Sequence, residues 1–214
     1  QIAALASIAR ERGISIASHD DDSAEKLAFM DGLEASISEF PISLDVAREA
    51  RARGLHTVAG APNVMLGHSP SGNLSAREAV QAGAIDVLCS DYYPAALLDA
   101  VFTLRDECGL DIARAFALVS VNPAKAAGIA DEVGSLAVGK RADVLLVREI
   151  ACGEAGTRTM PVVTRAFVGG HSVFRSHYPD QPLGYARDLG ERIDAARADA
   201  ARADAARALF PEAV

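Results

Sequence analysis

Short β-prone runs alternate with helical segments through the first hundred residues, and this alternation limits the fold more than any other feature. The β-prone runs are 14–18, 35–38, 56–59 and 85–89, and the helical segments are 1–12, 23–32, 43–53, 75–82 and one that starts at 95. Each unit of strand, loop and helix takes about 20 to 30 residues, which is typical of parallel strands joined by right-handed crossovers. The sequence therefore predicts an α/β fold built on a parallel sheet.

Polar or ionisable side chains follow each predicted strand at its carboxyl end. They are His19 with the aspartates after it, Glu39, Asn63 with His68, and Asp91. In parallel β/α folds ligands bind at this end of the strands, because the loops that lead from strand to helix meet there. We therefore expect the functional site at this edge of the sheet.

His19 and Asp91 are the candidate metal ligands, because neutral imidazole and carboxylate groups suit divalent cations such as Zn, Mn or Fe. Asp91 could also act as general base toward a metal-bound water. Glu39 is a candidate third ligand or a buried partner for a cation, and Asp20 and Asp21 are candidates for contacts to the substrate or the ligands. The alternative is structural, since aspartates favour helix starts and turns.

The segment 60–73 is a glycine-rich polar loop in the sequence, and loops of this composition often carry function. Its backbone N–H groups could hold phosphate oxygens. The segment lacks the glycine–lysine pattern of a P-loop, so an ordinary connecting loop stays open as the alternative.

The pattern changes after a predicted helix over 111–126, which contains Asn122 and Pro123 near its end. Alternating apolar runs on either side of a Gly-Gly pair at 169–170 predict a hairpin within a small β module over 131–178. The tail over 179–214 repeats an Asp-Ala-Ala-Arg unit, which favours a solvated helix over a helix that docks on a partner subunit. The expected domains are therefore 1–130, 131–178 and 179–214.

The composition excludes several classes of protein. Of the 214 residues 50% are hydrophobic, which argues against disorder, and no uncharged apolar run is long enough to span a membrane. A net charge of −8 argues against a nucleic-acid-binding surface, whose usual mark is a basic patch. Three separated cysteines, Cys89, Cys108 and Cys152, favour reduced thiols in the core and a cytoplasmic location.

Several motifs resemble those of the amidohydrolase superfamily. The run NPAKAAG at 122–128, followed by GSLAVGKRADV at 134–144, resembles the segment in which the last barrel helix of these enzymes leads into a small β-sandwich. More narrowly, four strand-end motifs resemble the branch of the superfamily that acts in phosphonate metabolism. They are SHDD at 18–21, SEFP at 38–41, GAPNV at 60–64 with HS at 68–69 and SGN at 71–73, and SDYYP at 90–94.

The resemblance implies a fold and an activity. The fold would be the C-terminal half of a TIM-type (β/α)8 barrel, about strands 5–8, with a small β-sandwich module and a C-terminal helix. The activity would be that of a metal-dependent hydrolase, a diphosphatase that converts α-D-ribose 1-methylphosphonate 5-triphosphate to the 5-phosphate and pyrophosphate in the carbon–phosphorus lyase pathway. The partners would be this small phosphorylated phosphonate and one or two divalent metals, in a chain that could form a homo-oligomer.

The resemblance also assigns residues to the site. His19 would match the metal ligand after strand five, and Asp91 would match the carboxylate after strand eight, which accepts a proton from the attacking water. Glu39 stands where most members of the superfamily have a histidine. The substrate and its phosphates would contact Asp20, Asp21, Asn63, His68, Ser69, Ser71, Asn73 and Tyr92.

The sequence contains no HxH motif, so the ligands that the first barrel strands usually provide are unaccounted for. We therefore expect Gln1 to be an internal residue of a longer enzyme, and this fragment alone to be inactive. Two other functions stay open. One is another amidohydrolase, which cleaves a cyclic amide or deaminates a base, and the other is a non-catalytic fragment that lacks the N-terminal metal ligands.

Overall fold

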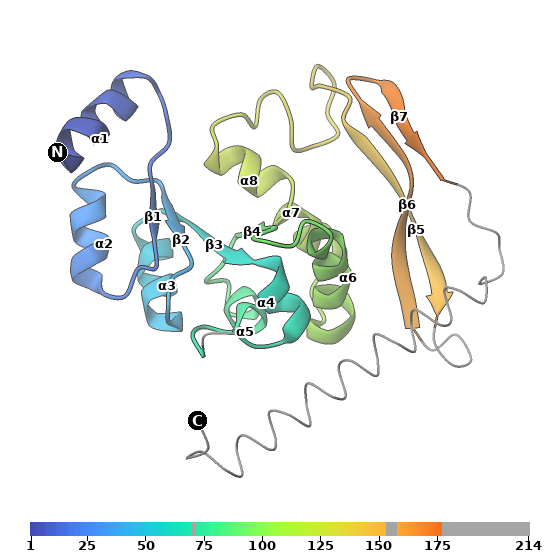
Figure 1. Ribbon diagram of the computed structural model, residues 1–214, viewed down its shortest axis with the longest axis horizontal. Coiled ribbons are helices and arrows are strands. Elements are labelled where there is room, and N and C mark those ends of the chain that lie inside the picture. Colours follow the sequence, from blue (N-terminus) through green and yellow to red (C-terminus); the bar gives the residue numbers. More distant parts are fainter. Residues whose placement is uncertain (70–71, 153–157, 177–214) are drawn as a thin grey trace, which may run out of the picture. The chain divides into compact units, whose positions relative to one another are not determined.

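The computed structural model describes residues 1–69, 72–152 and 158–176, and Figure 1 shows their helices and strands. The chain forms two compact units, residues 1–143 and residues 144–214. The predicted tail over 179–214 lies outside the described residues. In the part of the chain that is described, no helix is both long enough and apolar enough to cross a membrane.

A four-stranded parallel sheet forms the centre of the first unit, which confirms the predicted α/β fold. Its strands are β1 (Ala17–His19), β2 (Ile37–Glu39), β3 (His56–Gly60) and β4 (Val87–Cys89), in the order β1-β2-β3-β4. The register pairs His19 with Glu39, Glu39 with Val58, and Gly60 with Cys89. Because all four strands run parallel, their carboxyl ends lie at the same end of the sheet, with β3 extending two residues beyond the partner of Glu39.

Helices follow the strands as the alternation predicts. They are α1 (Ile2–Glu11) before the sheet, α2 (Ala24–Asp31), α3 (Leu44–Ala52), α5 (Ala76–Gln81) and α6 (Ala96–Cys108). Serine caps three of them: the hydroxyls of Ser23, Ser43 and Ser75 accept hydrogen bonds from backbone N–H groups three residues later. These caps satisfy donors that have no partner within the helix, so the start of each helix is set locally.

Two predicted elements differ from the structure. The segment 60–73 begins with a helix, α4 (Ala61–Leu66), because Pro62 lies near its start, where a proline N–H is not needed, and Gly67 ends it in the left-handed conformation. The predicted helix 111–126 is two helices, α7 (Ile112–Ala117) and α8 (Val121–Ala126). They separate at Ser120, whose backbone is not helical, and Pro123 falls in the first turn of α8.

The core of the first unit consists of small clusters of aliphatic side chains. Leu27, Val46, Ala50 and Leu55 pack together where α2 and α3 meet the start of β3, and a second cluster joins Val58, Val87 and Ala126. Alanine is frequent among the buried residues, and Phe102 of α6 is a buried aromatic side chain, whose ring meets that of Phe116 edge-on.

A polar network fastens the amino ends of β3 and β4. The Asp86 carboxylate accepts a hydrogen bond from Thr57 N at 2.8 Å, and it also lies 2.8 Å from His56 Nδ1 and 2.9 Å from Arg51 Nη1. The backbone carbonyl of Asp86 accepts a hydrogen bond from Asn122 Nδ2 at 2.8 Å, which adds α8 to the network. The network lies at the amino ends of the strands, opposite to the carboxyl ends where the candidate site is expected. It therefore contributes to the stability of the sheet and not to the site.

The segment 131–143 folds against α8, in the first unit rather than with the β module to which the sequence assigns it. Lys140 Nζ donates hydrogen bonds to the carbonyl oxygen of Ala130 and to Ser135 Oγ, and Arg141 N donates to the carbonyl oxygen of Glu132 at 2.9 Å. Gly134 approaches α8 so closely that a Cβ atom on it would stand 2.6 Å from the Ala124 Cβ atom. These contacts, made after residue 130, hold the segment to the parallel unit.

The second unit contains a three-stranded antiparallel sheet in the order β5-β6-β7. Its strands are β5 (Val144–Cys152), β6 (Arg158–Val168) and β7 (His171–Arg175). Gly169 and Gly170 both have positive φ angles, and Val168 pairs with His171 across them. A two-residue turn of this kind needs positive φ at both positions, so the predicted Gly-Gly hairpin is confirmed.

Substituting Gly134 should destabilise the first unit more than substituting Gly139. Both glycines have left-handed φ angles, +87° and +92°, but only Gly134 has atoms within 4 Å of the new Cβ position. Gly139→Ala should cost about 1–2 kcal/mol of unfolding free energy for the backbone conformation. Gly134→Ala should cost a further amount of about 1–3 kcal/mol for overpacking. Thermal unfolding of both variants measures the difference, and equal losses would show that the contact with α8 is not tight.

Asp86→Ala should lower the free energy of unfolding by about 3 kcal/mol, because it leaves the N–H of Thr57 and the nearby cations without their partner. Asp31→Ala is the matched control, since Asp31 is exposed at the end of α2 and should change stability by less than about 0.5 kcal/mol. Urea unfolding followed by circular dichroism compares the two. A loss for Asp86→Ala no greater than that of the control would contradict the role of the network.

Candidate functional site

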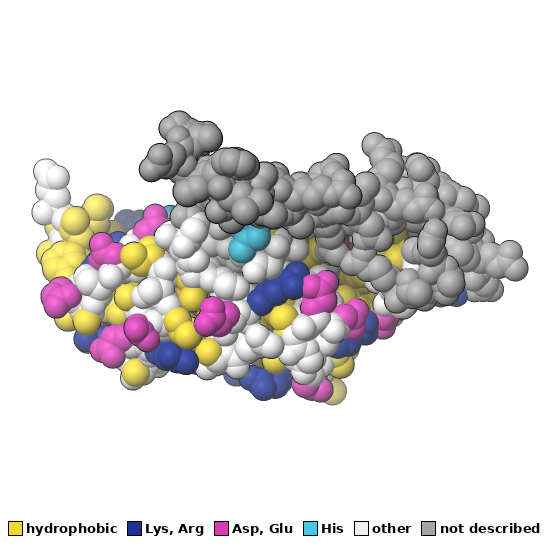
Figure 2. Space-filling view, turned by 90° about the horizontal axis from the view of Figure 1, so that it is seen from below, with side chains coloured by type: hydrophobic (Ala, Val, Ile, Leu, Met, Phe, Trp, Pro, Cys, Tyr) yellow, Lys and Arg dark blue, Asp and Glu magenta, His cyan; other side chains and the backbone are white. Residues whose placement is uncertain are grey.

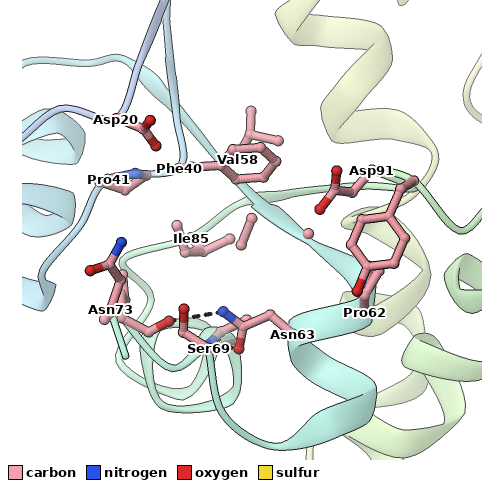
Figure 3. Close-up of a pocket in the computed structure, with 15 residues that line it drawn as sticks. Asp20, Phe40, Pro41, Val58, Pro62, Asn63, Ser69, Asn73, Ile85 and Asp91 are labelled. Carbon is pink, nitrogen blue, oxygen red and sulfur yellow. Dashed lines mark hydrogen bonds between the residues drawn. The ribbon is translucent and has the colours of Figure 1, made fainter. Parts of the chain in front are cut away.

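A cavity of about 290 Å³ opens at the edge of the sheet where the strands end (Figure 3). Six of its lining residues are ones that the sequence singles out: Asp20, Asn63, Ser69, Asn73, Asp91 and Tyr92. Figure 3 shows Asp20 and Asp91 on opposite sides of the cavity, with Asn63, Ser69 and Asn73 along a third side. The parallel register thus brings polar side chains from distant parts of the sequence to one hollow.

Apolar residues complete the cavity wall. Phe40, Val58 and Ile85 line it, together with Gly60 and other small residues of β3 and α4. Sequence patterns give little indication of Ile85, because an isoleucine at the start of the predicted strand 85–89 looks like any core residue. Phe40 has a clearer indication, since it follows Glu39 directly at a strand end.

Asp91 lies close to the backbone of β3. Its φ angle is +50°, in the left-handed region, and a Cβ atom on Gly60 would stand 3.3 Å from Asp91 Oδ2. The missing side chain of Gly60 therefore leaves room for the carboxylate to reach the end of β3. Asp91 is exposed to solvent, so its carboxylate is accessible from the cavity.

The pKa of the Cys89 thiol depends on the charged groups at this end of the sheet. Burial raises the pKa of Cys89, a hydrogen bond with the Asp91 backbone lowers it by a smaller amount, and the negative charges of Glu39 and Asp91 raise it further. The thiol is therefore protonated at neutral pH and is not a nucleophile. The same effect shows that the Glu39 and Asp91 carboxylates both lie near the end of β4.

His19 lies beside Asp20 at the end of β1. His19 Nδ1 is 3.1 Å from Asp20 Oδ2, and the imidazole meets the Phe40 ring edge-on, with 5.2 Å between ring centroids. The side chain of His19 is 56% exposed. It therefore remains accessible to a ligand, although His19 is not among the residues that line the cavity.

Asp21 has a different environment from the one expected of a substrate contact. It is completely buried, and the hydroxyls of Ser18 and Ser38 both donate hydrogen bonds of 2.5 Å to its Oδ2 atom. Lys26 Nζ lies 3.6 Å from its Oδ1 atom. We therefore reassign Asp21 from the substrate to the interior, where its charge is compensated by neighbouring side chains.

Asn63 also uses both ends of its side chain within the protein. Its Nδ2 donates to the carbonyl oxygen of Leu74 at 2.9 Å, and its Oδ1 accepts from Ala76 N at 3.0 Å. Asn63 therefore fixes the segment after α4, and this role uses its Oδ1 atom and one of its two N–H donors. His68 lies outside the cavity lining, with its Nδ1 3.3 Å from the carbonyl oxygen of Ser69, and Ser71 lies outside the described residues.

The predicted metal ligands do not form a complete centre by themselves. Within the described residues, no three His, Cys, Asp or Glu side chains gather as a group that could hold a metal ion. His19 ends β1 and Asp91 follows β4, which are the first and last strands of the sheet order. The described part of the chain therefore contains separate side chains that can each bind a metal, but these do not form a complete metal-binding site by themselves.

Comparison with known proteins gives consistent results. The model of the amidohydrolase family matches residues 1–173. The chain is 42% identical over 144 residues to the alpha-D-ribose 1-methylphosphonate 5-triphosphate diphosphatase of Escherichia coli K12, covering 66% of this chain and 38% of that protein. It is 37% identical over 87 residues to the dihydroorotase of Methanopyrus kandleri, covering 33% of this chain and 20% of that protein. The chain therefore spans well under half the length of either relative.

Solved structures share the fold. The structure of enamidase matches with a TM-score of 0.61 at 13% identity, covering 86% of this chain and 54% of that one. The structure of an amidohydrolase from Thermotoga maritima matches with a TM-score of 0.57 at 18% identity, covering 77% of this chain and 44% of that one. At such low identity these matches concern the fold alone. The match to the family model over residues 1–173, by contrast, shows that this chain belongs to the amidohydrolase family.

Proposed function

We propose that this chain is part of a metal-dependent hydrolase that converts α-D-ribose 1-methylphosphonate 5-triphosphate to the 5-phosphate and pyrophosphate. The observation that carries the proposal is the 42% identity over 144 residues to the Escherichia coli diphosphatase. The cavity supports it, because residues of all four strand-end motifs line one hollow: Asp20, Pro41, Asn63 and Asp91 each come from a different motif. The reaction takes place in phosphonate catabolism in this proposal.

The proposed parent fold is a (β/α)8 barrel, of which the four strands β1 to β4 are the last four. The parallel order of the strands and the helices between them support this assignment. The solved relatives support it as well, since this chain covers about half of each of them. In such a barrel the functional residues lie at the carboxyl ends of the strands, which is where the cavity lies.

We assign the proton-accepting role to Asp91. Its exposed carboxylate lies at the cavity wall and can take a proton from a water molecule placed in the cavity. The water oxygen would form a bond to the phosphorus nearest the ribose, and the bond from that phosphorus to the bridging oxygen would break. Pyrophosphate would leave with the bridging oxygen, and the ribose would keep one phosphate. The proton taken by Asp91 would then pass to solvent.

The metal of this proposal is a divalent cation held by His19 and Asp91, with Glu39 as a third candidate and further ligands from outside the described residues. A bound cation would make water more acidic and would reduce the negative charge of the phosphates. The side chains present are of the right chemical type, imidazole and carboxylate. His19 offers Nε2, because its Nδ1 lies beside Asp20.

The charge of the cavity also bears on the substrate. Asp20 and Asp91 line it, and no lysine or arginine is among the described residues of its wall. A triphosphate would be repelled by two carboxylates unless cations came with it. The cavity therefore suits a substrate that arrives with its own cations, and the uncharged side chains of Ser69 and Asn73 remain as contacts for its oxygens.

We place the protein in the cytoplasm in this proposal. Cys89, Cys108 and Cys152 are all free thiols in the structure, as expected in a reducing compartment. The partners are the phosphorylated phosphonate and its cations, and a homo-oligomer stays open. On the face seen in Figure 2, acidic side chains lie among basic and apolar ones, so the described residues on that face do not form the basic area that nucleic acids need.

A second candidate function is the hydrolysis of a cyclic amide. The 37% identity over 87 residues to the dihydroorotase of Methanopyrus kandleri favours it. A substrate screen with the full-length protein separates the two candidates. Pyrophosphate release from the ribose triphosphate supports the diphosphatase, whereas ring opening of cyclic amides without pyrophosphate release would replace it. Deamination of a base in the same screen would point to a deaminase instead.

A non-catalytic role is the remaining alternative, and metal analysis tests it independently of any substrate. The full-length protein, grown with added manganese or zinc, should contain a divalent metal in stoichiometric amount. A protein that folds but contains almost no metal under both conditions would favour the non-catalytic alternative.

Asp91→Asn should reduce pyrophosphate release by at least about 100-fold, because the amide cannot accept a proton. The substitution keeps the size of the side chain, so the cavity and the contact with Gly60 should be unchanged. Asp31→Asn is the matched control, because Asp31 is exposed at the end of α2 and is not part of the cavity. Steady-state rates of pyrophosphate release are compared for both variants of the full-length protein. Full activity of Asp91→Asn would exclude Asp91 as the proton acceptor.

A further inference from the structure

Lys26 occupies a position that its own helix does not favour. It lies in the first turn of α2, three residues after the capping Ser23, whose hydroxyl accepts a hydrogen bond from Lys26 N at 3.3 Å. The amino end of a helix carries partial positive charge, so a cation in the first turn is unfavourable there. Contacts that the ammonium group makes outside the helix must therefore offset this unfavourable position.

Those contacts all lie in the turn that follows β1. Lys26 Nζ donates a hydrogen bond of 2.7 Å to the carbonyl oxygen of His19 and one of 2.8 Å to the carbonyl oxygen of Asp20. The Oδ1 atom of Asp21 lies 3.6 Å from the same nitrogen. The ammonium group therefore makes two hydrogen bonds to backbone carbonyl oxygens, and it forms an ion pair with the carboxylate of the next residue.

Asp21 links this ammonium group to the sheet. Its carboxylate is completely buried, and its Oδ2 atom accepts hydrogen bonds from Ser18 in β1 and from Ser38 in β2, which pair with each other in the sheet. Its Oδ1 atom has no hydrogen-bond partner, so the nearby ammonium group is what compensates its charge. The position of Lys26 is therefore set by two strands at once.

The turn that Lys26 holds has an unusual backbone. Asp20 has a φ angle of +53°, and its N–H donates to the carbonyl oxygen of Glu39 at 2.9 Å. In this conformation the carbonyl groups of His19 and Asp20 both face one nitrogen atom, while the Asp20 side chain lines the cavity. Left-handed backbone is costly for a residue with a side chain, so contacts of this kind are needed to maintain it.

We propose that Lys26, through Asp21, is a positioning residue, which holds the turn that presents His19 and Asp20 at the edge of the sheet. It does not bind phosphate, since its donors are directed at backbone carbonyls and at a buried carboxylate. The part of this inference that concerns catalysis rests on the proposed hydrolase function. The part that concerns the geometry of the turn does not.

The test uses Lys26→Met in the full-length protein, with Lys125→Met as the matched control. Lys125 is an exposed lysine of α8 outside the cavity lining, and its removal should change neither the turn nor the kinetics. Lys26→Met should speed hydrogen exchange of the Asp20 amide by at least about tenfold, because the turn opens more often. Exchange of the amides in β3 should stay unchanged, which shows that the sheet remains folded.

Kinetics provide the second measurement. Lys26→Met should lower kcat by at least about tenfold and change KM by less than about threefold, since it displaces groups of the site without removing a contact to the substrate. Lys26→Arg keeps donors for the two carbonyl oxygens and should restore most of kcat. A rise in KM with normal exchange at Asp20 would show that Lys26 binds the substrate and would overturn the proposal.

The exchange measurement also separates this inference from the proposed function. If the wild-type protein releases no pyrophosphate, the hydrolase proposal fails, and exchange at Asp20 still decides whether Lys26 holds the turn. If Lys26→Met does not fold, Lys26→Gln replaces it, because its neutral amide has two N–H donors but cannot compensate the charge of Asp21. Its exchange at Asp20 should be faster than in the wild-type protein, while exchange in β3 stays unchanged. Unchanged exchange at Asp20 in folded Lys26→Met or Lys26→Gln would overturn the inference.

Discussion

The hydrogen-bonded register of four short parallel strands is the constraint on which the rest of the first unit depends. Each strand has only three to five residues, so little of the sheet could shift without loss of the whole pairing. A slip of one residue in β1 relative to β2 would move Asp21 away from Ser38 and leave a buried carboxylate without one of its donors. The same slip would carry His19 to the other face of the sheet. Register and site geometry are therefore fixed by the same contacts.

Left-handed backbone marks the places where the chain leaves the sheet. Asp20, Phe40 and Asp91 have φ angles of +53°, +55° and +50°, and each follows the end of a strand. Aspartate adopts this conformation more readily than most residues, whereas for a bulky residue such as phenylalanine it costs about 1–2 kcal/mol. The Phe40 ring lines the cavity and contacts the His19 ring, and those contacts help to maintain the unfavourable backbone. These three residues border the cavity, whereas Glu34, which also has a left-handed φ angle of +58° among the described residues, lies before β2 and outside the cavity lining.

Much of this arrangement can be predicted from the residues because local rules govern it. Serines at helix starts, glycines after helices and the repeated strand–loop–helix order predict the sheet and the edge that carries the site. Whether an individual polar residue lines the cavity or is buried depends on tertiary contacts instead. Asp20 and Asp21 are neighbours of the same type, yet one lines the cavity and the other is buried, because strand pairing places two serines beside Asp21 alone.

Other differences have the same origin. Asn63 has the chemistry of a phosphate ligand in the sequence, but the fold brings Leu74 and Ala76 within reach of both ends of its amide. The helix α4 begins with a glycine, an alanine and a proline, residues that are equally common in loops. The segment 131–143 precedes the antiparallel strands in sequence, and only its contacts with α8 assign it to the parallel unit. In each case long-range packing decides what local sequence leaves open.

The exposed position of Tyr92 has a practical consequence. Tyr92 lines the cavity and is 70% exposed, and the 214 residues contain no tryptophan. Tyr92→Trp would introduce the only tryptophan among these 214 residues, at the wall of the cavity. The larger ring can be accommodated because the side chain of Tyr92 is mostly exposed to solvent. Its fluorescence would then report occupancy of the cavity directly, so that candidate ligands could be ranked by titration before any turnover assay is in hand.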